Sequence, residues 1–316
     1  MSEPAVRGLD LCRDFFNAYG LPMLREKFPD LLGSLACGVC GPGSECFGFD
    51  DALSRDHDFE PGFYVFVPDS LDDRKLLFEL EREYSRLPKE FGGVRRTPLK
   101  PVGGARSGVV RTGDFFAARV GVPDGDLPLE GWLTLPEYAL AEAINGEIFF
   151  DGSGAVTAVR RRLERYPEPV RLKKLAGRLL LASQSGQYNY RRCLGHGEPA
   201  AAQLALFEFA RSVLHAVFLL NGRYMPFYKW CFRAARDLPK LPSLAETLEF
   251  LITADNSPNM AEIKSEAVEN VCALLAAEVE AQNIAPADPE LERLAYAVND
   301  AVDDVSVRAL NIFAGV

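Results

Sequence analysis

The sequence predicts an α+β protein in which a mixed first domain, residues 1–155, precedes an all-helical second domain, residues 156–316. In the first half, glycine- and proline-rich segments separate β-branched and aromatic runs, which favour strands, from amphipathic runs, which favour helices. The second half consists almost wholly of helical patterns. With 316 residues, 48% hydrophobic and 25% charged, the chain is long enough to bury a sizeable core without disulfides.

The first domain is expected to alternate helices and strands around one glycine turn. Ser70, ahead of two acids, is the expected start of one helix, and Asn145 with Gly146 the expected end of another. The expected elements are a helix over 5–27, strands within 31–41 and 56–68, a helix over 70–87, a strand within 104–112, helices from 114 and over 136–144, and a strand over 147–151.

Helix start signals punctuate the second domain, and together they predict a bundle from about residue 160 to residue 316. An N-cap residue followed by proline is favourable because proline's missing N–H would be unpaired at the first helical position. The signals are a capping box at Ser243 and Glu246, and an N-cap with proline at Ser257 and Pro258 and at Asp288 and Pro289.

Composition bounds the location and the partners. The most apolar run, residues 212–220, is too short to span a bilayer, and the N-terminus lacks the basic-then-apolar order of a secretion signal. We therefore expect a cytoplasmic protein without membrane contact, whose seven cysteines are free thiols. The net charge of −10 argues against nucleic acid, because affinity for a long polyanion comes mostly from neutralising its phosphates.

Two local features leave more than one interpretation. Cys37 and Cys40 form one CxxC pair, but structural zinc usually takes four ligands and no second pair exists, so a buried strand is favoured. Basic residues also gather between residues 159 and 192, either as a solvated helix face or, for a few of them, facing a triphosphate. These are Arg160, Arg161, Arg162, Arg165, Arg171, Lys173, Lys174, Arg178, Arg191 and Arg192, against the acids Glu164 and Glu168.

The segment GPGSECFGFDDALSRDHDFE, residues 41–60, carries the chemistry. Its glycine turn, with Gly43 and Ser44, can place backbone N–H groups and a hydroxyl around phosphate oxygens. Asp56 and Asp58 follow, and on a strand positions i and i+2 project from the same face. Two carboxylates held that close repel unless cations compensate. Two divalent ions about 4 Å apart would do so and would clamp a phosphoryl displacement.

A glycine-serine pair followed about a dozen residues later by Asp-x-Asp resembles the signature of the polymerase-beta-like nucleotidyltransferase superfamily. The wording GSExxGFDDxxSxDHDF, with LLNGRYMPFYKW at 219–230 and RALNIFAG at 308–315, more closely resembles a bacterial family, domain of unknown function 4037, akin to aminoglycoside and lincosamide nucleotidyltransferases. The resemblance implies a catalytic domain with a small mixed sheet and a helical domain covering the nucleotide. It makes Gly43 and Ser44 the phosphate turn and Asp56 and Asp58 the metal ligands.

Two departures from the superfamily pattern stand out. Ser54 is separated from Asp56 by Arg55, whereas the antibiotic-modifying relatives place serine directly before the first aspartate. A third carboxylate is expected on a later strand, and GVVRT contains none. Asp151 is the candidate substitute, with Glu147 behind it, although an acid in a turn is also ordinary loop chemistry.

Other polar residues near the motif remain open. His57 points to the opposite face of a strand from the two aspartates, so we expect a core or supporting role. An HD-type phosphohydrolase needs further ligating histidines, and His196 and His215 stand in no ligand motif. The pair Asp50 and Asp51 either caps a helix or binds the acceptor.

In the second domain Lys229 is the candidate contact to the triphosphate, because the resemblance places the helical domain over the nucleotide and lysine is a common phosphate ligand. The equal alternative is a surface lysine extending past Tyr228 and Trp230. Arg192 and Tyr188 are weaker candidates of the same kind.

The sequence therefore predicts a nucleotidyltransferase that uses two Mg²⁺ ions, or Mn²⁺. It would move a nucleoside monophosphate from a triphosphate such as ATP to a hydroxyl of a small molecule or protein, and release pyrophosphate. Asp56 and Asp58 would hold the metals and Asp151 would complete the catalytic set. The alternatives are a noncatalytic nucleotide-binding or interaction module of the toxin-antitoxin type and, disfavoured by the charge, a polynucleotide polymerase.

Overall fold

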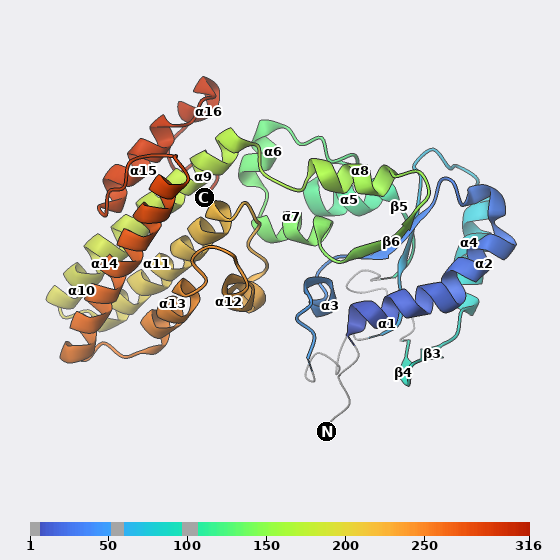
Figure 1. Ribbon diagram of the computed structural model, residues 1–316, viewed down its shortest axis with the longest axis horizontal. Helices are drawn as coiled ribbons and strands as arrows, with labels where there is room; N and C mark the ends of the chain where they lie inside the picture. Colours follow the sequence, from blue (N-terminus) through green and yellow to red (C-terminus); the bar gives the residue numbers. More distant parts are fainter. Residues whose placement is uncertain (1–6, 52–59, 97–106) are drawn as a thin grey trace. The chain divides into compact units, whose positions relative to one another are not determined.

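The computed structural model describes residues 7–51, 60–96 and 107–316 (Figure 1). The chain forms two compact units. The sheet unit comprises Met1–Leu127 and Ala139–Glu164, and the helical unit comprises Pro128–Tyr138 and Arg165–Val316. The predicted division between residues 155 and 156 falls at the start of helix α8, Ala155–Arg162, which belongs to the sheet unit.

A four-stranded mixed sheet with the order β5-β2-β1-β6 forms the centre of the sheet unit. β1 pairs antiparallel with β2 and with β6, and β2 pairs parallel with β5. The α+β class with a small mixed sheet is therefore confirmed. The strands are β1 Ala36–Val39, β2 Tyr64–Val67, β5 Gly108–Arg111 and β6 Glu147–Asp151.

Helices surround this sheet in the predicted order. The expected opening helix is present but contains a π-helical turn, Phe16–Gly20, where Gly20 lets the ring of Phe63 approach so closely that a Cβ would lie 2.4 Å from it. The remaining elements are α1 Gly8–Phe15, α2 Leu21–Lys27, a 3₁₀ turn Pro29–Leu31, α3 Ser44–Phe47, α4 Arg74–Arg86, the hairpin β3 Glu90–Phe91 and β4 Val94–Arg95, α5 Thr112–Val120 and α7 Glu137–Ile144, which begins in the helical unit.

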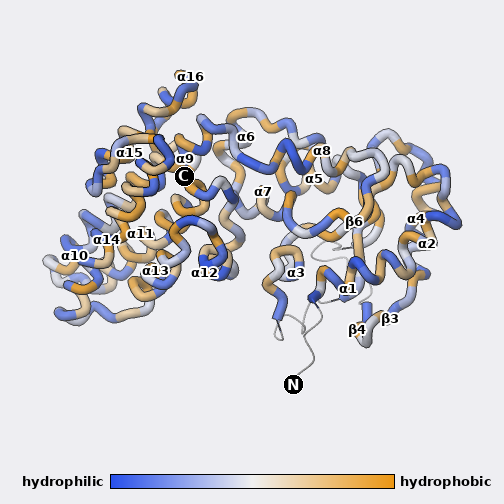
Figure 2. The backbone as a smooth tube through the Cα atoms, in the orientation of Figure 1, coloured by the Kyte–Doolittle hydropathy of each residue, from blue (hydrophilic) through white to orange (hydrophobic). Residues whose placement is uncertain are grey.

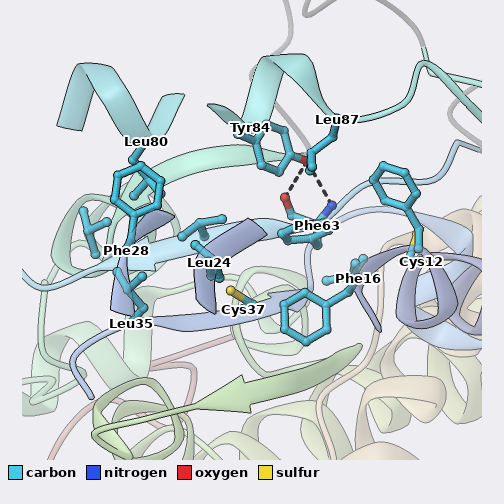
Figure 3. Close-up of a cluster of buried hydrophobic side chains, with 14 of the residues drawn as sticks. Cys12, Phe16, Leu24, Phe28, Leu35, Cys37, Phe63, Leu80, Tyr84 and Leu87 are labelled. Atoms are coloured by element: carbon cyan, nitrogen blue, oxygen red, sulfur yellow. Dashed lines mark hydrogen bonds between the residues drawn. The ribbon is translucent and has the colours of Figure 1, made fainter. Parts of the chain in front are cut away.

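Side chains alternate across the two central strands, and each face buries a different set of helices. Phe63, just before β2, meets Tyr84 of α4 (Figure 3), whose hydroxyl donates to the Phe63 carbonyl at 2.8 Å and accepts from its N–H at 3.2 Å. Tyr64 and Phe66 contact Phe115 of α5, with ring centroids 5.3 and 5.0 Å apart. The entry of the chain into β2 is thereby fixed from both sides.

The helical unit packs long helices around α9 and α11. α11 packs against α9 and α13, and α15 packs against α9. This confirms the predicted helical second part. Its helices are α6 Leu129–Thr134, α9 Glu168–Ala182, a π-helical segment Ser183–Tyr190, α10 Arg191–Gly195, α11 Pro199–Leu220, α12 Tyr228–Arg236, α13 Leu244–Thr253, α14 Pro258–Ala281, α15 Leu291–Asp300 and α16 Val305–Arg308.

α11 is the one described helix that is long and apolar enough to cross a membrane by length and composition. The apolar run 212–220 is the last part of this helix, which begins at Pro199 and also carries the charged residues Glu208 and Arg211. Figure 2 colours much of α11 as hydrophobic, and 61% of its apolar window is buried in the protein. Core helices pass the same test, so the finding is weak support for a membrane segment.

The predicted helix starts are only partly confirmed. α14 begins at Pro258 after Ser257, as expected. Ser243 precedes α13 but makes no capping hydrogen bond, because its backbone is already helical. α15 begins after Glu290, since Asp288 instead accepts from the Glu290 N–H. In the sheet unit Asp73, not Ser70, caps α4.

Candidate functional site

The aspartates on which the metal prediction depends, Asp56 and Asp58, lie outside the described residues, as do Ser54, Arg55 and His57. The flanks of this segment are described. The Gly8 N–H donates to Asp50 Oδ2 at 2.6 Å, and Cys12 Sγ donates to the Glu60 carbonyl at 3.4 Å. Both flanks are thus held by the same helix, α1.

The predicted glycine turn leaves the end of the interior strand β1. Gly41 has a φ of +128°, which glycine adopts without strain. Gly43 precedes α3 and Ser44 is its first residue, so the structure brings these two predicted residues together. Because β1 and β2 are antiparallel with Gly38 opposite Tyr64, the chain enters β2 at the end of the sheet at which it leaves β1.

Asn145 and Gly146, predicted only as a helix stop, hold this turn. Asn145 Nδ2 donates to the Gly41 carbonyl at 2.7 Å, and its Oδ1 accepts from the Gly41 N–H at 2.8 Å. The Gly146 N–H donates to the Cys46 carbonyl at 2.8 Å. A Cβ on Gly146 would stand 2.0 Å from the Val39 carbonyl, so only glycine fits against the end of β1.

Arg119 of α5 lies beside the turn. Its Nη2 would be 3.2 Å from a Cβ built on Gly41. Its Nη1 donates to the Phe115 carbonyl at 3.1 Å and its guanidinium lies 3.6 Å from the Phe115 ring centroid. Its Nε is buried without an acceptor among the described residues. A cation with a spare donor therefore stands next to Gly41 of the turn.

Arg160 of α8 approaches the same region. It donates to the carbonyls of Ile144 and Asn145, the latter at 3.0 Å. Burial lowers its pKa, while the nearby Cys40 and Cys46 act in the opposite direction. Its Nη1 is buried without a partner in the described part of the chain. A buried guanidinium that lacks an acceptor is costly, and an anionic ligand is one group that would satisfy it.

Acidic groups also lie near the turn. A Cβ on Gly43 would lie 2.0 Å from Glu45 Oε1, so the Glu45 carboxylate covers Gly43. Burial, together with the smaller effects of the Glu45, Glu60 and Asp50 carboxylates, raises the pKa of the Cys12 thiol to about 12. These carboxylates therefore place negative charge near the Cys12 thiol, and a polyphosphate placed here needs cations between itself and the acids.

Asp151, the predicted third carboxylate, is not at this end of the sheet. It pairs with Ala36, whereas Glu147 pairs with Val39 beside the turn, about 10 Å away along the strand. Asp151 Oδ2 accepts from the Thr157 N–H at 2.8 Å and hydroxyl at 2.7 Å. Its contacts are those of a residue that positions α8.

Glu147 lies at the end of the sheet beside the turn, but its carboxylate is paired with Arg13. Arg13 Nε donates to Glu147 Oε1 at 2.8 Å, and a second bond from Arg13 makes the pair bidentate. A carboxylate held in this way is a fixed negative charge near the turn.

The predicted contacts of the second domain lie in the helical unit. Lys229 Nζ is 5.1 Å from the ring centroid of Trp230, which agrees with the interpretation of a lysine extending past its aromatic neighbours. Arg192 donates to the Tyr188 hydroxyl at 3.0 Å, with its guanidinium 5.5 Å from that ring. Contact of either residue with a triphosphate stays a prediction.

Metal-binding groups are sparse where side chains are described. Over residues 7–51, 60–96 and 107–316, no set of three histidine, cysteine, aspartate or glutamate side chains is placed to hold an ion. Cys37 and Cys40 are buried free thiols, and burial raises the pKa of Cys40 to about 11. Protonated thiols at pH 7 are poor metal ligands.

Sequence reasoning missed Arg119 and Asn145 as site residues. Arg119 lies in an ordinary amphipathic pattern, and its approach to Gly41 arises from the packing of α5 on the sheet. Asn145 was predicted as a helix stop, and that role already accounted for an asparagine before Gly146. Arg160 was present only as one member of a basic run.

Comparison with known proteins gives limited matches. Residues 132–231 match the family described as domain of unknown function (DUF4037), which covers just under a third of the chain and leaves out the glycine turn. No curated protein matches. Among solved structures, a nucleotidyltransferase-like protein from Exiguobacterium sibiricum 255-15 is similar at 11% identity, with 89% of each chain covered and a TM-score of 0.38.

Proposed function

We propose that the protein is a metal-dependent nucleotidyltransferase. It transfers a nucleoside monophosphate from a nucleoside triphosphate, with ATP as the first candidate, to a hydroxyl of a small molecule or protein. The observation that carries this proposal is the turn Gly41–Ser44 at the end of β1, with the Arg119 guanidinium beside Gly41. The motif that begins at this turn continues to Asp56 and Asp58.

The local charge suits a nucleotide held together with cations. Arg119 and Arg160 offer unused donors, which favour phosphate oxygens. Glu45 and Asp50 offer negative charge close by, which disfavours a bare polyphosphate. Positive charge beside Gly41 and negative charge beside Gly43 favour a complex of metal and nucleotide over the free metal ion or the free nucleotide.

Magnesium is the cation that fits this donor set, because its ligands are carboxylate and phosphate oxygens. Asp56 and Asp58 would hold it, and we assign the third carboxylate to Glu45 in place of Asp151. When bound, the metal neutralises charge on the transferred phosphoryl group.

The chain's own groups would then position the reactants. The turn and the two arginines bind the phosphates, and Asn145 keeps Gly41 in place. The acceptor oxygen attacks the α-phosphorus, the bond from that phosphorus to the pyrophosphate oxygen breaks, and the acceptor proton passes to a carboxylate. Catalysis of this kind is mainly positioning and charge neutralisation.

The test is calorimetric titration of a nonhydrolysable ATP analogue with and without magnesium, followed by a pyrophosphate-release assay with an acceptor panel. Asp56→Asn and Asp58→Asn should abolish magnesium-coupled binding and release. Asp303→Asn, an exposed residue of the helical unit, is the matched control. Glu45→Gln should reduce the magnesium dependence of binding, because it removes the charge beside Gly43.

The outcomes separate the alternatives. Failure of wild-type protein to bind any triphosphate in the presence of magnesium contradicts the proposal. Coupled binding without pyrophosphate release for any acceptor favours the noncatalytic nucleotide-binding module instead.

A further inference from the structure

A separate cavity lies wholly within the helical unit. It has a volume of about 540 Å³, which is in the range of small-molecule sites. Its walls come from the start of α7, from α9 and α11, and from the segment that leads into α12. Its lining is Leu133, Thr134, Leu135, Pro136, Glu137, Tyr138, Lys174, Arg178, His215, Met225, Pro226, Phe227, Tyr228, Gly315 and Val316.

A buried carboxylate organises one wall. Glu137 Oε1 lies 2.7 Å from His215 Nδ1, and Glu137 Oε2 accepts from the Met225 N–H at 3.0 Å. Burial acts to raise the pKa of Glu137, but His215, the Met225 N–H and Lys174 together lower it below its ordinary value. Glu137 is therefore a satisfied anion, and it orients the His215 ring with Nε2 on the opposite edge.

Two cationic side chains, Lys174 and Arg178, line the cavity together with Glu137. Lys174 Nζ donates to the carbonyls of Leu133 and Gly315 at 2.9 and 2.6 Å, so most of its donors are used. Arg178 makes no hydrogen bond or ion pair to the described residues, and its Nε is buried without an acceptor. Lys174 and Arg178 thus place two cationic side chains around Glu137, the one carboxylate side chain among the described lining residues.

The third feature is an exposed aromatic rim. Tyr138, Phe227 and Tyr228 are 40%, 39% and 73% exposed. The rings of Tyr138 and Phe227 are perpendicular with centroids 5.5 Å apart, and those of Phe227 and Tyr228 are 4.4 Å apart. Large aromatic surfaces left in water at the mouth of a cavity are typical of sites that cover a flat ligand.

We propose that this cavity binds a small organic oxyanion, a carboxylate or phosphate attached to a planar ring. Arg178 holds the oxyanion, because it is the cation whose donors the protein leaves unused. His215 Nε2 offers a second polar contact, and Tyr138, Phe227 and Tyr228 cover the ring. The cationic side chains of Lys174 and Arg178 disfavour cationic ligands. This proposal is independent of nucleotide transfer, since it uses no residue of the glycine turn.

The experiment is calorimetric titration of the full chain with phenyl phosphate and benzoate, using benzamide as the neutral analogue. At least one of the two anions should bind at least tenfold more tightly than benzamide. Comparison of the two anions shows whether phosphate or carboxylate is the preferred head group. Arg178→Gln should weaken binding of the preferred anion at least tenfold, as expected for loss of a charge-assisted hydrogen bond. Arg191→Gln, an exposed arginine of α10, is the matched control and should bind as wild type.

A rim variant keeps the proposal testable if Arg178→Gln does not fold. Tyr228 is mostly exposed, so Tyr228→Ala should fold, and it should weaken phenyl phosphate or benzoate several-fold while leaving inorganic phosphate unchanged. The proposal is overturned if neither anion binds more tightly than benzamide. It is also overturned if folded Arg178→Gln binds as wild type, or if Tyr228→Ala has no effect on either ring-bearing anion.

Discussion

Buried cations have two kinds of surroundings, and Arg178 of the helical unit shares the kind found at Arg119 and Arg160 of the sheet unit. In the helical unit, Lys173 is fully buried and donates to Asn299 Oδ1 and to the carbonyls of Arg308 and Leu310, at 2.6 to 3.0 Å. In the sheet unit, Arg119 and Arg160 each keep one buried nitrogen without an acceptor. The Lys173 ammonium donates to three acceptors of the protein, whereas Arg119 and Arg160 each keep an unused donor.

This difference separates a structural role from a binding role. Lys264 repeats the pattern of Lys173, with acceptors on Gln203, Ala254, Asp255 and Asn256. A cation that is fully satisfied inside the protein stabilises the fold and has little left for a ligand. A buried cation with a spare donor lowers stability and is retained where a ligand supplies the acceptor.

The largest expected effect is on the satisfied lysine. Lys173→Met leaves three acceptors unpaired and should lower the free energy of unfolding by about 3 kcal/mol or more. Lys229→Met, which removes an exposed lysine of the same unit, is the control and should be close to wild type. Urea denaturation checks both. Equal stability of the two variants would contradict the structural role assigned to a fully hydrogen-bonded buried lysine.

The pH dependence of the free energy of unfolding tests the role of the buried Lys174. Burial lowers its pKa from 10.5 to about 8, so the folded protein binds this proton more weakly than the unfolded chain does. The contribution of Lys174 to stability should therefore rise with pH between about 8 and 10.5, by about 3 kcal/mol. The difference in unfolding free energy between wild type and Lys174→Met isolates this term, because other groups cancel. A difference that is flat or falls across this window would contradict the assignment.

A smaller effect is expected at the glycine turn. Asn145→Ala removes both hydrogen bonds to Gly41 and should lower the free energy of unfolding by about 1 to 2 kcal/mol. It should also weaken nucleotide binding, since the turn loses its anchor. Asn270→Ala provides a comparison at an exposed position within α14 and should not lower stability. Wild-type nucleotide affinity in Asn145→Ala would show that the turn does not need this anchor.

Local pattern predicted most elements of the fold, and tertiary packing accounts for the rest. Strand β2 and helix α7 followed from an aromatic and valine-rich run and from the Asn145-Gly146 stop, which are properties of a few adjacent residues. α15 begins later than predicted because Asp288 caps a turn and pairs with Arg293. No local pattern distinguishes Asp288 from an ordinary N-cap.

The candidate site likewise combines residues that a local sequence pattern predicts with residues that only tertiary packing brings together. Gly43 and Ser44 could be predicted as part of a turn because the glycine-rich motif is contiguous in the sequence. Asp151 was chosen by its place after a strand, but the antiparallel register of β6 carries Glu147, not Asp151, to the turn. Arg119 could not be found, because only the packing of α5 brings it to Gly41.

The most direct test of the spare-donor account is the measurement of stability and ligand affinity on the same variant, Arg119→Gln. Affinity for a nonhydrolysable triphosphate with magnesium should fall tenfold or more, while the midpoint of urea denaturation stays near or above that of wild type. Loss of stability with unchanged affinity would contradict the account, because it would place Arg119 with the structural lysines.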